Sequence, residues 1–523
     1  MAILFSCNDR DKTTIVKSTE DVYEKEVLYM EPIRKITPEN SYSDLFIDSV
    51  DMGSFINGSN DEEADKTNLR SFYNYRNNEF AWFTSDGLTE QAKGFWNLQS
   101  KLGYDVDKSL RNRVDSLLNE DSLSISLSDS FYVQTELQLT RAFIPFYKKY
   151  RSQTHFAGLP IEVAIPAEKK DPVAWAKEIV SREVKSDTVS QYYKLRQKLV
   201  QHLALTRDGD STAINQSASR LKKGNNSADI AALKKRLQLT GDLAGRDTSG
   251  VYNDSLTIAI KSYQKQNGFA VTGNLSDSLI SSLNRPAKTL LPILLINLMR
   301  AQWMPLNQEE NYISVNVPEF MLRVYEKDSL KMEIPVAVGK EGASTTVFNG
   351  ILNEIVFSPY WNIPESIVKE ELIPKMKNNP NYLKSKNMEI TGKRDSIPII
   401  RQKPGKGNSL GKVKFLFPNP YDIYFHDTYE KAVFNKNNRA VSHGCIRLKE
   451  PAKLAEYLLR DKSDWTTEKI RTAMNADTDK SVSVRSVPVW ISYYTQWVDD
   501  RGALRSAEDM YFLDKLVEKR LFL

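Results

Sequence analysis

The sequence is poor in cysteine and histidine. Its 523 residues include two cysteines, Cys7 and Cys445, and four histidines. A structural zinc site usually needs four Cys or His ligands, so we expect neither a zinc site nor any other metal or cofactor. A disulfide between the two cysteines is also disfavoured, because a chain terminus seldom packs firmly enough to hold one.

Long apolar runs and a strong excess of charge are absent too. No stretch reaches the roughly 18–20 apolar residues of a membrane span. The best candidate, residues 290–299, contains Pro292 and Asn297 and is predicted to be a buried helix. The net charge is only +5, with no arginine-rich arm, zinc-finger spacing or P-loop, so we expect no nucleic-acid partner. The 41% hydrophobic and 27% charged residues are typical of a globular protein.

The N-terminus allows two interpretations. Leu4-Phe5-Ser6-Cys7 resembles a bacterial lipobox, in which the cysteine would carry a lipid and anchor the chain to the outer or inner membrane. However, the preceding apolar run is shorter than the roughly 7–15 residues of a signal peptide, and no positive charges precede it. A lipid on Cys7 and an accidental match therefore both stay open. Residues 1–30 are predicted to be a tether in either case.

Residues 31–225 are predicted to form a helical scaffold. Apolar residues recur there at three- and four-residue spacing, in the segments 89–102, 106–118, 128–150 and 172–203. His155 and His202 stand alone in this region, without the partner residues that catalysis needs. The region is therefore interpreted as a support for domains further along the chain.

Residues 226–287 are predicted to form a compact three-helix domain. Ile230, Leu233 and Leu237 make one helical stripe, which Gly241 ends as a C-cap glycine. The pattern resembles the peptidoglycan-binding domain type 1, through Gly241-Asp-Leu243, Tyr252, Ala259-Ile260, Tyr263-Gln264, Gly268, Thr272-Gly273 and Leu283-Asn284. The resemblance implies binding to cell-wall glycan; a helical spacer is the alternative.

From residue 311 the hydrophobic period changes from helical to alternating. Strands are predicted over 312–317, 321–325, 331–339, 345–348, 351–357, 413–417 and 422–425. An insertion at about 363–400 is predicted to be a lysine-rich helical cap on this β domain, which would span 288–497 and be followed by a helical tail over 498–523. The predicted fold class is α+β multidomain: a helical scaffold, a three-helix domain, and a mainly-β domain with a helical cap.

The residues with the clearest chemical signal are Ser442-His443-Gly444-Cys445-Ile-Arg447, together with His426 upstream. Gly444 allows a tight turn that would expose the Cys445 sulfur, and backbone N–H groups of such a turn can face an oxyanion. A thiol needs a base, and His426 closes a predicted strand from which it could reach the cysteine. A buried structural cysteine is the alternative, which the surrounding pattern makes improbable.

This pattern resembles the L,D-transpeptidase (YkuD) family, whose signature is His, a spacer, then Ser/Thr-His-Gly-Cys-x-Arg/Asn. Further segments resemble the large YcbB-type members of that family: Trp303-Met-Pro305, Val338-Gly339-Lys340, Tyr360 to Pro364, Arg401 to Gly405 and Phe415 to Pro420. The resemblance implies a periplasmic enzyme that acts on peptidoglycan stem peptides and forms 3-3 cross-links through a thioester. It also implies acylation by carbapenems.

The resemblance further implies roles for individual residues. Cys445 would be the nucleophile and His426 the general base and acid, with His443 and Gly444 beside the oxyanion. Four more residues are assigned to the substrate-binding side. Ser442 would orient the loop, and Arg447 would bind a substrate carboxylate or form a salt bridge within the loop. Tyr424 and Trp361 would line the donor groove or belong to the core. Either a backbone carbonyl or a side chain could orient His426.

Other functions remain open at this stage. With water as acceptor, the same site would be an L,D-carboxypeptidase or amidase. A non-catalytic wall-binding scaffold would also fit the domain order, although Cys445, His426 and His443 are all present. A papain-like protease is disfavoured because no Cys-Gly-Ser-Cys-Trp pattern surrounds the cysteine.

Overall fold

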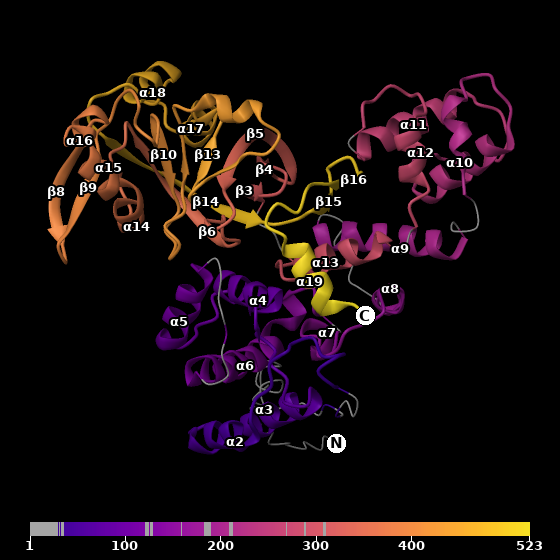
Figure 1. Ribbon diagram of the computed structural model, residues 1–523, viewed down its shortest axis with the longest axis horizontal. Coiled ribbons are helices and arrows are strands. Elements are labelled where there is room, and N and C mark those ends of the chain that lie inside the picture. The colour runs from indigo at the N-terminus through magenta and orange to yellow at the C-terminus, as the bar shows by residue number, and fades with distance from the viewer. Residues whose placement is uncertain are drawn as a thin grey trace, which may run out of the picture.

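The computed structural model describes Met30, Pro32 and residues 36–120, 125, 129–157, 159–182, 190–208, 213–267, 269–286, 289–306 and 310–523. Cys7, Gly268 and the predicted tether except Met30 lie outside this part of the chain. The described residues form three lobes that meet at a central group of helices (Figure 1). No helix in the described part is long and apolar enough to span a membrane. The predicted α+β multidomain class is confirmed.

The N-terminal lobe is helical and encloses an aromatic core that includes Phe72, Trp82, Phe95 and Phe143. Side-chain caps define its helix starts: Thr89 Oγ1 accepts from Ala92 N at α4, and Asp129 accepts from Phe131 N at α6. Its elements are α2 (Ser49–Gly58), α3 (Glu63–Tyr75), β1 (Phe83–Thr84), β2 (Gly87–Leu88), α4 (Glu90–Lys101), α5 (Lys108–Leu118), α6 (Ser130–Tyr150) and α7 (Ile161–Ala164).

The second lobe is the three-helix domain, with α10 (Ala228–Leu239), α11 (Asp254–Gln266) and α12 (Asp277–Leu283) preceded by η2 (Gln216–Arg220). As predicted, α10 ends at Gly241, which has a positive φ of 80°. Residues of the wall-binding pattern hold the helices together. Tyr252 donates to the Gly273 carbonyl at 2.9 Å, and Gln264 accepts from Gly273 N at 2.8 Å. These parts of the pattern therefore have a structural role.

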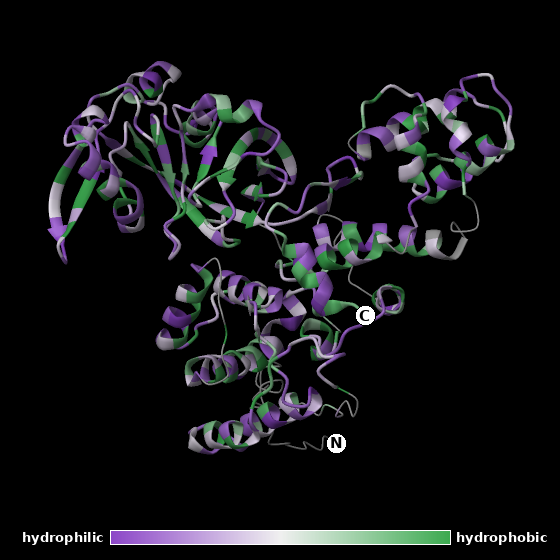
Figure 2. Ribbon diagram, viewed as in Figure 1, coloured by the Kyte–Doolittle hydropathy of each residue, from purple (hydrophilic) through white to green (hydrophobic). Residues whose placement is uncertain are grey.

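The central group of helices joins the lobes. It consists of α8 (Pro172–Ser181), α9 (Gln191–Asp208), α13 (Leu291–Gln302) and α19 (Leu513–Leu521), which share one apolar core. Helix α13, predicted from sequence to be buried, is buried along most of its length, and Figure 2 shows it as largely hydrophobic. Its Arg300 pairs with Glu90 of α4 at 2.9 Å and with Asp514 of α19 at 2.6 Å. These nearly buried ion pairs fix the angle between the helical lobe and the C-terminal segment.

The third lobe is a nine-stranded sheet in the order β12-β5-β13-β11-β10-β6-β14-β3-β4. Because β4 also pairs with β5, the strands from β5 to β4 close into a ring around an apolar core. Helices α17 (Pro451–Leu459) and α18 (Thr467–Ala473) pack on it. The strands are β3 (Asn311–Asn316), β4 (Met321–Glu326), β5 (Ser329–Gly339), β6 (Asn349–Phe357), β10 (Val413–Leu416), β11 (Phe425–His426), β12 (Ala440–Ser442), β13 (Ile446–Leu448) and β14 (Lys480–Ser492).

The insertion predicted between strands is present at one end of this lobe (Figure 1), and we call residues 361–402 the cap. Its helices have a core of Val368, Leu372 and Ile400. The cap also contains a three-stranded antiparallel sheet, which the sequence analysis did not predict. Its elements are β7 (Trp361–Asn362), α14 (Glu365–Ile367), the π-helix η4 (Val368–Leu372), α15 (Ile373–Asn378), α16 (Tyr382–Ser385), β8 (Met388–Arg394) and β9 (Ile397–Gln402).

Three local predictions were wrong. Residues 345–348 are not a strand, because Thr345 turns towards the 444 loop and bonds there instead. Residues 422–424 of the strand predicted over 422–425 are not in a strand, because Asn419 bonds to both backbone groups of Ile423, and β11 begins only at Phe425. The tail from 498 is not wholly helical: β15 (Gln496–Val498) and β16 (Leu504–Ser506) form a hairpin before α19, across a turn at Asp499–Gly502.

One glycine contact provides a stability prediction. A Cβ on Gly94 of α4 would lie 2.3 Å from the ring of Trp303, whereas a Cβ on Gly53 of α2 would meet nothing within 4 Å. Gly94→Ala is expected to lower the free energy of unfolding by about 2 kcal/mol, because a buried ring must move. The matched Gly53→Ala is expected to raise it by about 0.5 kcal/mol through helix propensity. Denaturant unfolding followed by tryptophan fluorescence measures both, and equal midpoints for the two variants would contradict the contact.

Candidate active site

Strand pairing brings the predicted nucleophile and base together. β11 runs parallel to β13, with Phe425 opposite Ile446 and His426 opposite Arg447. Side chains two residues apart on a strand share a face, so His426, Tyr424 and Cys445 all project from the same side of these neighbouring strands. The Ile446 N–H donates to the Tyr424 carbonyl at 3.2 Å, which keeps the two strand starts in register. The β11–β13 pairing therefore closes the fifteen residues between His426 and Ser442 into a loop.

The loop before Cys445 is held by three side chains. Gly444 has a φ of 100°, a conformation open to glycine, and its carbonyl accepts from Thr345 Oγ1 at 2.7 Å. Since carbonyl and N–H point in opposite directions across a trans peptide, this bond turns the Cys445 N–H away from Thr345. Ser442 Oγ donates to the Cys445 carbonyl at 2.6 Å. The Tyr511 hydroxyl, from the C-terminal segment, accepts from Thr345 N at 3.2 Å.

Thr345 was not identified from the sequence as part of the site. Its hydroxyl donates to Gly444 and also accepts from the Gly339 N–H at 2.9 Å, so it joins β5 to the cysteine loop. A Cβ on Gly339 would lie 2.2 Å from the Ala343 carbonyl, which accounts for glycine at this point of the Val338-Gly339-Lys340 segment. The only available signal was Gly339 itself, since glycine in a strand often marks a close backbone approach.

A backbone carbonyl orients His426. Its Nδ1 lies 2.5 Å from the Asp427 carbonyl oxygen, which leaves Nε2 as the nitrogen available to accept a proton. The Asp427 side chain does not orient the ring, because it binds Lys431 Nζ at 2.6 Å and accepts from Lys412 N at 2.9 Å. Of the two possibilities left open by the sequence, the structure has the carbonyl.

Cys445 and His426 are both neutral at rest. Burial raises the pKa of Cys445 to about 11, although hydrogen bonds from Tyr424 oppose the shift. Burial lowers the pKa of His426 to about 3, and the positive charges of Arg447, Lys431 and Lys414 add to this effect. The site therefore holds a thiol and a neutral imidazole.

Two contacts connect the cap to this site. His443, whose side chain is 45% exposed, places Nε2 3.2 Å from Glu371 Oε1 of the cap helix η4. Trp361 of β7 is hydrogen-bonded to the Tyr424 side chain, which is in turn hydrogen-bonded to Cys445. Both aromatics are thus at the site and partly exposed. Glu371 was not singled out in the sequence, because nothing local distinguishes it from Glu370.

Arg447 has a structural partner in this structure. Its Nη1 lies 2.9 Å from Glu430 Oε2, and its side chain is 17% exposed. Nε of Arg447 is buried with no hydrogen-bond partner among the described residues. The loop salt bridge is therefore present, and the carboxylate-ligand alternative for Arg447 stays a prediction.

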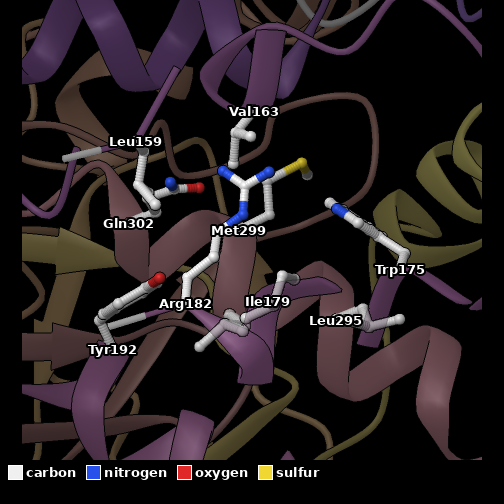
Figure 3. A pocket seen from close by; sticks show the side chains of 10 residues that line it. Leu159, Val163, Trp175, Ile179, Arg182, Tyr192, Leu295, Met299 and Gln302 are labelled. Carbon is white, nitrogen blue, oxygen red and sulfur yellow. The ribbon is translucent and has the colours of Figure 1, made fainter. Parts of the chain in front are cut away.

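A small cavity lies away from the reactive pair. A cavity of about 10 Å³ lies between the central helices, lined by Trp175, Met299 and Arg182 among others (Figure 3). This is about the space of one water molecule, so it is a packing gap rather than a substrate site. No group of three or more His, Cys, Asp or Glu residues in the described part of the chain could hold a metal ion.

Three segments of the chain match family models of known domains. Residues 310–484 match the family model described as "L,D-transpeptidase catalytic domain" (YkuD). Residues 67–199 match a "Scaffold domain", and residues 226–283 match a "Putative peptidoglycan binding domain". A curated relative, "Putative L,D-transpeptidase" of Haemophilus influenzae, is 33% identical over 224 residues, which cover 40% of this chain and 45% of that protein. The chain thus spans less than half the length of that relative.

Solved structures are similar only in part. An L,D-transpeptidase from Mycobacterium smegmatis is 14% identical, with a TM-score of 0.20, and the match covers 35% of this chain and 58% of that one. An L,D-transpeptidase from Stackebrandtia nassauensis is 14% identical, with a TM-score of 0.19, covering 52% of this chain and 95% of that one.

Proposed function

We propose that this protein is a cysteine L,D-transpeptidase that forms 3-3 cross-links in the cell envelope. The proposal starts from two matches: residues 310–484 match an L,D-transpeptidase catalytic domain of the YkuD family, and residues 226–283 match a peptidoglycan-binding domain. The observation that carries the proposal is the juxtaposition of His426, on β11, and Cys445, directly before the paired strand β13, beneath a cap. The periplasm and a possible lipid on Cys7 belong to the same proposal.

The first half of the reaction is acyl transfer to the cysteine. Cys445 Sγ attacks the carbonyl that links the L-centre of a donor tetrapeptide to its terminal D-residue, while His426 Nε2 takes the thiol proton. The N–H of Cys445, directed by the Thr345–Gly444 bond, faces the developing oxyanion. The C–N bond then breaks, the D-residue leaves with the proton from His426, and a thioester remains on Cys445.

The second half reverses these steps with a different amine. The side-chain amine of a neighbouring stem attacks the thioester, His426 takes its proton, and the C–S bond breaks to restore the thiol. One amide is exchanged for another, so no external energy source is required. Water competes with the amine at this stage, and hydrolysis would make the enzyme a carboxypeptidase. The cap supports transfer, because covering the thioester excludes water.

The contact between the cap and the cysteine loop predicts how much the cap favours transfer over hydrolysis. In Glu371→Gln the charge that faces His443 is lost, so the cap is held less firmly. Because both side chains are partly exposed, the pair is worth at most about 1 kcal/mol. The ratio of cross-linked dimer to hydrolysed tripeptide is therefore expected to fall up to about fivefold. Chromatography of products measures it, with the exposed neighbour Glu370→Gln as control. An equal ratio in both variants would show that the contact does not hold the cap.

The proposed function as a whole is tested with purified disaccharide-tetrapeptide. Mass spectrometry is expected to show a protein adduct on Cys445 and cross-linked dimers. Tripeptide without dimers would establish the carboxypeptidase instead. Absence of any product, with binding to intact sacculi retained, would leave a wall-binding scaffold.

A further inference from the structure

Lys414 is a cation that lies beside Cys445 and His426. None of the reaction steps described above involves it. It lies on β10 directly opposite His426 of β11, and His426 is in turn opposite Arg447 of β13. Partners in register present their side chains on the same face of a sheet. A row of three basic residues therefore crosses these strands, with the catalytic imidazole in the middle.

The three cations around His426 differ in their partners. Arg447 is paired with Glu430 at 2.9 Å and Lys431 with Asp427 at 2.6 Å. Among the residues that the structure describes, Lys414 forms no ion pair, although it is half-buried. Asp479 and Glu354 act on it only as more distant charges. A half-buried ammonium without a paired carboxylate is costly, which indicates that a ligand supplies the missing anion.

Lys414 is also directed at the place where the substrate must lie. Its Nζ is 5.8 Å from the centroid of the Tyr424 ring, and the Tyr424 side chain is hydrogen-bonded to Cys445. The Lys414 and Cys445 side chains are close enough to interact electrostatically. In a donor that ends one residue beyond the attacked carbonyl, the terminal carboxylate lies within about 4 Å of that carbonyl, one residue's reach along the chain.

We propose that Lys414 binds the terminal carboxylate of the donor stem peptide and so selects donors that end one residue after the bond to be cleaved. The inference rests on the proposed function and adds to it the group that recognises the donor end. A longer stem would place a neutral amide where the carboxylate belongs, and Lys414 would remain buried without an anion.

Binding the carboxylate has a second consequence, for the base. The Lys414 charge is one of those that lower the pKa of His426. A carboxylate placed beside Lys414 offsets that charge, so the imidazole becomes a stronger base when the correct donor is bound. The proton transfer from Cys445 is then favoured in the complex rather than in the free enzyme, which limits reactions of the thiol in the absence of donor.

The test compares two donors that differ only at the recognised end: a disaccharide-tetrapeptide with its free carboxylate, and the same molecule with a terminal carboxamide. The kcat/KM for acylation of Cys445 is measured by mass spectrometry without acceptor. Wild type is expected to prefer the carboxylate roughly 10- to 100-fold, the size typical of a charge-assisted hydrogen bond. Lys414→Met is expected to lose most of that preference, and Lys414→Arg to retain it.

The control and the opposing outcomes separate this inference from the function on which it rests. Lys412→Met removes an exposed lysine two residues away, whose Nζ binds Asn475, and is expected to keep the wild-type preference. Thermal unfolding confirms that each variant is folded, and a general folding defect would slow both donors equally. Equal acylation of wild type by both donors, or full preference in Lys414→Met, overturns the role of Lys414 while the function stands. A wild-type enzyme acylated by neither donor overturns both.

Discussion

Replacing Cys445 with alanine is expected to abolish the thioester adduct and lower the rate of cross-link formation by about 10⁴-fold or more, because no other residue in the described site can act as a nucleophile. The expected loss is large because the intermediate itself cannot form. Mass spectrometry of the protein with disaccharide-tetrapeptide measures the adduct, and chromatography measures dimers in the same sample.

The control for Cys445→Ala is a measurement of its binding to sacculi, a property that does not depend on catalysis. Residues 226–283 have their own core, separate from that of the β lobe, so Cys445→Ala is expected to bind sacculi as wild type does. Cys445→Ser tests whether the thiol in particular is needed, since a hydroxyl is far less readily ionised than a thiol. Dimers formed by the alanine variant at the wild-type rate would exclude Cys445 as the nucleophile.

The second large effect concerns His426. His426→Gln is expected to lower kcat/KM for acylation about 10²- to 10⁴-fold, the usual contribution of a positioned general base. Glutamine has a similar size and can bond to the Asp427 carbonyl, but it cannot take the thiol proton. The adduct on Cys445 should still form slowly, which distinguishes the loss of a base from the loss of the nucleophile.

The pH profile tests the electrostatic basis of the same site. Only the neutral imidazole is a base, and with a pKa of about 3 it stays neutral as the pH falls through the ordinary histidine value of 6.5. The thiol, with a pKa of about 11, stays protonated as the pH rises above neutral. Therefore kcat/KM for acylation is expected to be nearly flat from about pH 5 to 9, with its acidic limb near the low pKa of His426. An acidic limb close to pH 6.5 would show that burial and the neighbouring cations do not act on His426 in the working enzyme.

Much of the architecture and the reactive pair could be predicted because their signals are local. The three-helix domain follows from apolar spacing and from Gly241, the C-cap glycine that ends its first helix. The Ser-His-Gly-Cys segment by itself predicts the nucleophile, since a glycine directly before a cysteine indicates a tight turn that exposes the sulfur. His426 was recognisable as the residue that closes a strand.

The supporting contacts could not be predicted because they join residues far apart in the chain. Thr345 and Gly444 are 99 residues apart, and the sequence pattern of 345–348 favoured a strand. Glu371 reaches His443 only because the cap folds over the sheet, and Asp427 orients His426 with its carbonyl, which every residue type has.

The sequence by itself thus determined which residues are predicted to carry the chemistry and the order of the domains, since both depend on neighbouring positions and their period. The tertiary structure alone decided how that chemistry is controlled. The pairing of β11 with β10 on one side and β13 on the other sets Lys414 and Arg447 beside His426, and that row, together with burial, leaves the imidazole neutral. Such effects depend on distance and desolvation in space, which no local pattern of residues encodes.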